Sequence, residues 1–71
     1  MKEQKIMRKI NKAKEFYVWC VMDGQDVGHY FKTTKSDVLN LTKKYIEDNA
    51  DLTNLDNCYD LHKESNILYI N

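Results

Sequence analysis

Residues 15–34, EFYVWCVMDGQDVGHYFKTT, decide the fold of this chain. Two runs of β-branched and aromatic residues flank the polar segment 23–26, and that pattern predicts a β-hairpin. Gly24 suits the first central position of a type II′ turn, because that position requires a positive φ. Both faces of the predicted hairpin are apolar. Each face must therefore be covered by the rest of the chain or be available to a partner.

A turn at Gly24 and Gln25 sets the register of this hairpin, since side chains alternate between the two faces of a strand. The face that we expect to point into the core pairs Met22 with Val27, Cys20 with His29, Val18 with Phe31 and Phe16 with Thr33. The opposite face pairs Val21 with Gly28, Trp19 with Tyr30 and Tyr17 with Lys32. We define the aromatic patch as Tyr17, Trp19, Tyr30 and Lys32. These residues are the candidates for binding a protein partner or nucleic acid.

Periodicity and capping signals predict the remaining elements. Residues 1–14 place apolar side chains at helical spacing and predict a basic N-terminal helix or arm. Residues 34–37, TKSD, match a capping box, so a central helix should begin there and end near residue 49. Residues 50–57 are rich in Asp and Asn and predict a loop. Residues 58–71 predict a second hairpin that turns at Ser65 and Asn66. One face would carry Tyr59, Leu61, Leu68 and Ile70, and the other Cys58, Asp60, His62, Glu64, Ile67 and Tyr69.

Together these elements predict one small α+β domain of 71 residues with the order α-β-β-α-β-β. Residues 1–14 form the helix or arm, and residues 15–71 form a ββαββ domain. We expect a four-stranded antiparallel sheet with the central helix packed on one face. The N-terminal helix is expected to cover part of the other face and the aromatic patch with it. The expected core side chains are Val18, Phe31, Leu41, Tyr45, Leu61 and Leu68.

The formal net charge of zero hides an asymmetry along the chain. Residues 1–14 carry six basic groups and one acidic group, which gives +5, whereas residues 36–71 carry three basic and seven acidic groups, which gives −4. Either the basic end lies against the acidic end, or the two ends are separate binding surfaces. The candidate acidic partner surface consists of Glu47, Asp48, Asp51 and Asp56.

Metal and catalytic sites are not expected. The chain has no C-x₂₋₄-C pair, and Cys58 and His62 would lie about 13 Å apart along a strand, too far to share one metal. Cys20 beside His29 could form a thiolate–imidazole pair, but nucleophilic catalysis also needs an orienting group and a cleft. The chain contains no phosphate-binding, zinc-protease or nucleophile-elbow motif. The sequence therefore predicts a protein without cofactor, metal or enzymatic activity.

The longest apolar run, residues 16–22, is far shorter than the roughly 20 residues of a membrane span. The N-terminus lacks the apolar core of a secretory signal, so we expect a cytoplasmic protein that does not engage membranes. A short, Pro-free, Lys- and Asn-rich chain is typical of accessory proteins of phages and mobile elements. The leading hypothesis is a protein-binding or inhibitory module that occupies a surface of a larger protein, with a homodimer as an additional candidate. The alternative hypothesis is nucleic-acid binding by the aromatic patch together with the basic helix.

Overall fold

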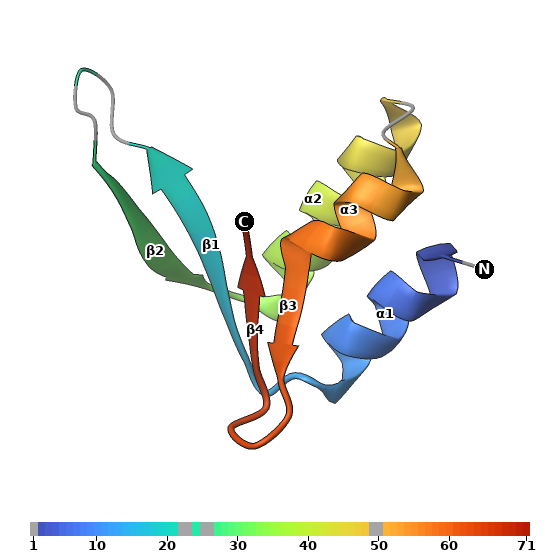
Figure 1. Ribbon diagram of the computed structural model, residues 1–71, viewed down its shortest axis with the longest axis horizontal. Coiled ribbons are helices and arrows are strands. Elements are labelled where there is room, and N and C mark those ends of the chain that lie inside the picture. The colour runs from blue at the N-terminus through green and yellow to red at the C-terminus, as the bar shows by residue number, and fades with distance from the viewer. Residues whose placement is uncertain (1, 22–23, 25–26, 49–50) are drawn as a thin grey trace.

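The computed structural model describes residues 2–21, 24, 27–48 and 51–71, and Figure 1 shows a small α+β domain. The described elements, in chain order, are α1 (Lys2–Lys12), β1 (Glu15–Val21), β2 (Gly28–Thr33), α2 (Lys35–Glu47), α3 (Leu52–Cys58), β3 (Tyr59–His62) and β4 (Ile67–Ile70). The order is therefore α-β-β-α-α-β-β. The predicted N-terminal helix, central helix and two hairpins are present, and one helix was not predicted.

The four strands form one mixed sheet in the order β2-β1-β4-β3. Each hairpin is antiparallel, but the central pair β1 and β4 is parallel, so the prediction of a fully antiparallel sheet is wrong. Alternation along a strand shows which side chains share a face and says nothing of the direction of the neighbouring strand. A parallel pair needs a long crossover, and the chain between β1 and β4 provides one that includes α2 and α3.

The register of the first hairpin is confirmed. Phe16, Tyr17, Val18, Trp19, Cys20 and Val21 oppose Thr33, Lys32, Phe31, Tyr30, His29 and Gly28 respectively. Gly24 has a φ of 75°, a value that glycine adopts without steric cost. The predicted partner of Val27, Met22, and the second turn residue, Gln25, lie outside the described residues, so the turn type stays a prediction.

The second hairpin also follows the predicted alternation. Tyr59 and Leu61 share a face with Leu68 and Ile70, since they pair directly across β3 and β4. The strand begins at Tyr59, because Cys58 is the last residue of α3. Residues 63–66 form the turn, and Asn66 at its end has a φ of 57°.

The central helix begins as predicted, because the Thr34 side chain accepts a hydrogen bond from the backbone N–H of Asp37 at 3.2 Å. Val38 and Thr42, which lie four residues apart on the same side of α2, face the core and are buried. The prediction that Leu41 and Tyr45 belong to the core is wrong: Leu41 is half-buried and the Tyr45 side chain is 38% exposed. The apolar side chains of this helix lie along two adjacent rows. Their spacing in the sequence does not show which of the two rows packs against the sheet.

The short helix α3 replaces the predicted loop at residues 50–57. Asp51 caps it, since its carboxylate accepts a hydrogen bond from the backbone N–H of Thr53 at 2.9 Å. Leu55 is buried and Leu52 packs against the core. An Asp- and Asn-rich segment is therefore helical here because one Asp caps it and two Leu side chains anchor it.

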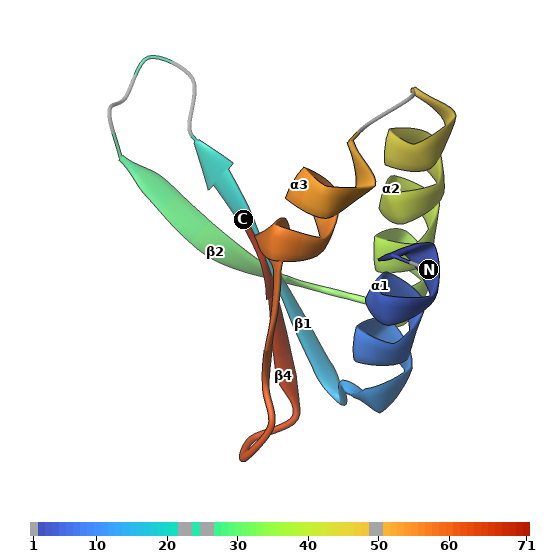
Figure 2. The same ribbon diagram turned by 45° about the vertical axis from the view of Figure 1, so that its right-hand side comes forward.

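All three helices lie on the same side of the sheet, as the two views in Figures 1 and 2 agree. The prediction that the N-terminal helix covers the opposite face is wrong. Two of its apolar residues, Ile6 and Ile10, are fully buried in the same cluster as the inward-facing side chains of the strands. That cluster contains Ile6, Ile10, Phe16, Val38, Leu55, Tyr59, Leu68 and Ile70. The predicted core residue Leu68 is confirmed, and Val18 and Leu61 pack at the edge of the cluster.

A buried hydrogen-bond chain crosses this core. The Thr42 hydroxyl donates to the Val38 carbonyl at 2.7 Å, so its oxygen is available to accept from the Tyr59 hydroxyl, 2.5 Å away. Burial raises the pKa of the Tyr59 hydroxyl. The two polar groups are therefore satisfied within an otherwise apolar cluster.

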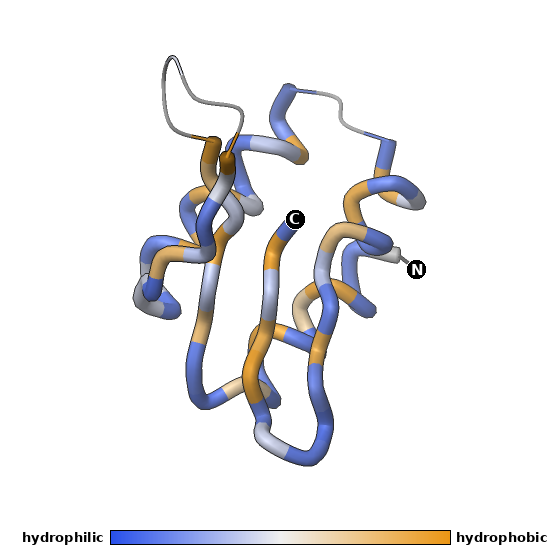
Figure 3. The backbone as a smooth tube through the Cα atoms, turned by 60° about the vertical axis from the view of Figure 1, so that its left-hand side comes forward, coloured by the Kyte–Doolittle hydropathy of each residue, from blue (hydrophilic) through white to orange (hydrophobic). Residues whose placement is uncertain are grey.

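The outer half of the first hairpin extends past the rest of the sheet. β4 pairs with β1 only from Glu15 to Val18, so the strands beyond Val18 form a two-stranded ribbon. Figure 3 shows hydrophobic colour at the ends of both ribbon strands, beside the grey trace. Phe31, predicted to be core, is 44% exposed on the edge strand β2, where it pairs with Val18, so that prediction is wrong. Its face of the strand is the correct one, but the helices do not extend far enough to cover it.

Candidate functional site

The face of the sheet opposite to the helices carries the aromatic patch. Phe16 and Leu68 are buried under the helices, so the alternating neighbours Tyr17 and Tyr69 point to the other side. The structure brings Tyr17, Trp19, Tyr30 and Lys32 together on that side, as predicted. Trp19 is 43% exposed and Tyr30 is 41% exposed, large fractions for side chains of this size. Among the described residues, no helix covers this face.

Two further rings from the second hairpin extend the patch. Tyr69 of β4 opposes Tyr17 of β1, and His62 of β3 lies in edge contact with Tyr69 at a ring-centroid distance of 4.9 Å. The sequence places Tyr69 and His62 on a common face of the second hairpin. It did not place them beside the aromatic patch, because that requires knowing that β1 and β4 are neighbours. We define the aromatic face as the aromatic patch together with Tyr69 and His62.

The rings of the aromatic face form one continuous cluster. Trp19 contacts Tyr30 edge to face at 5.0 Å, and Tyr30 contacts Tyr69 in the same way at 5.0 Å. Tyr17 and Tyr69 are stacked at 5.6 Å with an interplanar angle of 21°. These are the favourable geometries of aromatic pairs, and each such contact contributes about 0.5–1.5 kcal/mol beyond area burial. The cluster is therefore an organised surface that spans all four strands.

Local contacts fix the outer rings of the face in place. The Trp19 ring lies directly over Gly28, where a Cβ would overlap its atoms, so a larger residue here would force the ring to shift. The Tyr30 hydroxyl donates to the side-chain oxygen of Asn71. The backbone N–H of Asn71 in turn donates to the Cys58 carbonyl at 2.9 Å. The first hairpin is thus tied to the end of α3 through one residue.

The charges on the aromatic face are of both signs. At the edge of the face formed by β2, Nζ of Lys32 lies 3.7 Å from Oε1 of Glu15, and both side chains are well exposed. At the opposite edge, formed by β3, Nε2 of His62 lies 3.2 Å from Oδ2 of Asp60, and both side chains are also exposed. Exposed pairs of this kind contribute about 0–1 kcal/mol, so the four groups remain available to a partner.

The candidate acidic partner surface is assembled in part. Glu47 and Asp48 lie exposed at the end of α2, and Asp51 lies exposed at the start of α3. Asp56 does not join them as an unpaired carboxylate, because its Oδ1 lies 3.0 Å from Nζ of Lys9. We therefore define the acidic surface as Glu47, Asp48 and Asp51.

The basic helix α1 lies on the helical side of the sheet. Its Lys9 side chain donates to the carbonyls of Asp56 at 3.0 Å and Tyr59 at 2.8 Å, in addition to the ion pair. Asp56 Oδ1 is buried and accepts no well-aligned hydrogen bond, so the contact to Lys9 is mainly electrostatic. At this position the basic and acidic ends of the chain do lie against each other. The helix α1 and the aromatic face are on opposite sides of the sheet.

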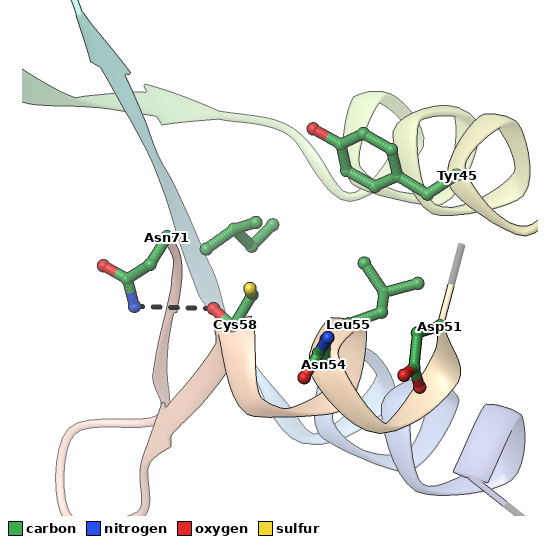
Figure 4. Close-up of a pocket in the computed structure, with 7 residues that line it drawn as sticks. Tyr45, Asp51, Asn54, Leu55, Cys58 and Asn71 are labelled. Carbon is green, nitrogen blue, oxygen red and sulfur yellow. Dashed lines mark hydrogen bonds between the residues drawn. The ribbon is translucent and has the colours of Figure 1, made fainter. Parts of the chain in front are cut away.

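One hollow on the helical side has a volume of about 270 Å³ (Figure 4). It is lined by Tyr45, Asp51, Asn54, Leu55, Cys58, Ile70 and Asn71. Its carboxylate, Asp51, already caps α3, and Figure 4 shows Leu55 and Tyr45 lining it between α3 and α2. The lining offers one thiol, Cys58, without a histidine or lysine among the described residues around it.

The cross-strand pair of Cys20 and His29 is present, as the register predicted. Both side chains are exposed on the ribbon, where His29 makes an edge contact with Phe31 at 6.3 Å. In the part of the chain that the structure describes, no group of three His, Cys, Asp or Glu side chains could hold a metal ion. Nor does any helix in the described ranges have the length and hydropathy needed to cross a bilayer.

Comparison with models of protein families, with curated proteins and with solved structures gives no match to this chain.

Proposed function

We propose that this chain is a non-catalytic protein-binding module that acts by occupying a surface of a larger protein. The observation that carries this proposal is the aromatic face, which covers four strands and lies on the side of the sheet away from all three helices. Contiguous exposed apolar surface on a small domain marks an interaction site. Tyr and Trp are the residues most enriched among those that dominate binding energy at protein interfaces.

The charge distribution supports a protein partner over nucleic acid. Aromatic rings on an open sheet can stack with bases, and Trp19 and Tyr30 are exposed enough to do so. Such binding also needs cations beside the rings to hold the phosphates. Here Lys32 stands beside Glu15, and Asp60 lies at the other edge of the face. The basic helix α1 is on the opposite side of the sheet, so it cannot extend this face.

The acidic surface is a second contact region for a larger partner. Glu47, Asp48 and Asp51 are exposed in the helical layer, where they would complement a basic groove. A contact through these carboxylates weakens as salt is raised, whereas a contact through the aromatic face persists. The two regions can therefore be distinguished with the same partner.

The proposal is tested by affinity capture from a nuclease-treated cell lysate with the wild-type chain, Trp19→Ala and Tyr45→Ala. Tyr45 is a matched control, since it is an exposed aromatic residue in the helical layer. We expect a retained protein that is lost with Trp19→Ala and kept with Tyr45→Ala. Lys substitutions at Glu47 and Asp48 report separately on the acidic surface. A nanomolar complex with single-stranded DNA or RNA, lost with Trp19→Ala, would show instead that the alternative hypothesis is correct.

A further inference from the structure

The central row of the aromatic face has a particular order. Tyr17 pairs with Lys32 in β2 and with Tyr69 in β4, and Tyr69 pairs with Asp60 in β3. The row therefore reads Lys32, Tyr17, Tyr69, Asp60 from one edge of the sheet to the other. A basic group stands at one end, an acidic group at the other, and two stacked rings lie between them. Reversed end to end, such a row is complementary to itself in both charge and aromatic character.

We propose that a second copy of this chain occupies the aromatic face, in a symmetric face-to-face dimer. The inference rests on the proposed function, because the second copy occupies the same face as the larger protein and gives way to it when the weak dimer dissociates. A twofold axis parallel to the strands, between β1 and β4, lays β2 of one copy over β3 of the other. Lys32 then faces Asp60 of the second copy. Because the interface is isologous, this contact occurs twice.

The same axis also places aromatic side chains of one copy against aromatic side chains of the other. Tyr17 lies over Tyr69 of the second copy, and the two Trp19 side chains come to opposite sides of the axis, where the ribbon extends beyond β4. Sheets that pack face to face keep their strands nearly aligned, which this axis satisfies. The helical layers point outward in the dimer, so the acidic surface stays accessible to a larger partner.

The size of the face indicates a dimer that dissociates on dilution. All four strands run side by side over four residues, a block of roughly 19 by 13 Å, and the two-stranded ribbon adds roughly 10 by 10 Å. That footprint of roughly 350 Å² is below the ~800 Å² per partner of a standard stable interface. A concentration series is therefore required to detect the association.

The test is sedimentation velocity over a concentration series with Lys32→Asp, Asp60→Lys and their equimolar mixture. Each single variant places like charges together at both contacts of its own dimer, and we expect its dissociation constant to rise roughly tenfold or more. In the mixture, one copy of each variant restores an opposite-charge pair at both contacts, so dimers should reappear. The double variant Lys32→Asp/Asp60→Lys should dimerise like the wild type. Lys43→Asp, on the exposed side of α2, is the matched control and should change nothing.

Trp19 is the single tryptophan of the chain, so its fluorescence gives an independent readout. We expect its emission to shift to shorter wavelength as the wild-type concentration is raised, and to stay constant for Lys32→Asp. Circular dichroism confirms that each variant is folded.

Three outcomes would overturn the dimer. A wild-type chain that stays monomeric up to about 1 mM excludes it, whatever else binds. A dimer that is insensitive to both charge reversals uses another surface. Two variants that fail to associate on mixing contradict the predicted axis. A monomer that still captures a larger protein through Trp19 refutes this inference and leaves the proposed function standing. A monomer that captures no protein refutes the dimer and the proposed function together.

Discussion

At the scale of a single residue, Tyr59 carries a titratable hydroxyl into the core, where Thr42 is its hydrogen-bond partner. Burial raises the pKa of this hydroxyl above its ordinary value of 10.0. Above pH 10 the unfolded chain therefore loses the Tyr59 proton while the folded chain retains it. Since the unfolded state then binds fewer protons than the native state, the free energy of unfolding falls as pH rises. Below pH 10 both states are protonated at this residue and its contribution does not depend on pH.

Replacing Tyr59 by Phe removes that dependence. We expect urea unfolding from pH 8 to pH 11 to show a steeper loss of stability above pH 10 for the wild type than for Tyr59→Phe. At pH 8 the variant should be less stable by about 1 kcal/mol, because the hydrogen bond to Thr42 is lost. Parallel stability curves for the two proteins above pH 10 would contradict the burial of this hydroxyl in the folded state.

At the scale of an element, α3 depends on a single cap. Asp51 accepts from the N–H of Thr53 at the start of a helix of only seven residues, and helices this short are not stable alone. Asp51→Ala should therefore lower the free energy of unfolding by about 1 kcal/mol in chemical denaturation. Asp51→Asn keeps a capping oxygen and should come within a few tenths of a kcal/mol of the wild type. Equal destabilisation by both variants would show that charge, and not capping, matters at this position.

The elements also show how far the sequence alone could predict the fold and the site. Alternation within each hairpin predicted every described pairing of β1 with β2, and therefore the aromatic patch. It could not predict that β1 lies parallel to β4, because local patterns contain no information on contacts between distant strands. For the same reason Tyr69 and His62 were not assigned to the site. The missed helix α3 has the composition of a loop, and its helical state depends on burial of Leu55, which is a tertiary contact.

For the molecule as a whole, Phe16 and Phe31 show how far the buried core extends across the sheet. Phe16 is buried where β1 lies under the helices, whereas Phe31 is 44% exposed on the edge strand β2. Phe16→Ala should cost about 3–5 kcal/mol, enough to unfold most of so small a domain. Phe31→Ala should change the free energy of unfolding by less than about 1 kcal/mol. Both are measured by thermal and urea unfolding, and a large loss for Phe31→Ala would show that the helices cover Phe31 in solution.

The parallel pairing of β1 with β4 also has a consequence for how the chain acquires its fold. The two hairpins are local and can form early, but their union joins segments from opposite ends of the sequence. Closing so long a loop is entropically costly, and folding rates fall as such distant contacts come to dominate. During synthesis, α1 and the first hairpin leave the ribosome well before their core partners Tyr59 and Leu68. The aromatic hairpin therefore exists for a time without its sheet, and this interval is when it is most exposed to misassociation or to a chaperone.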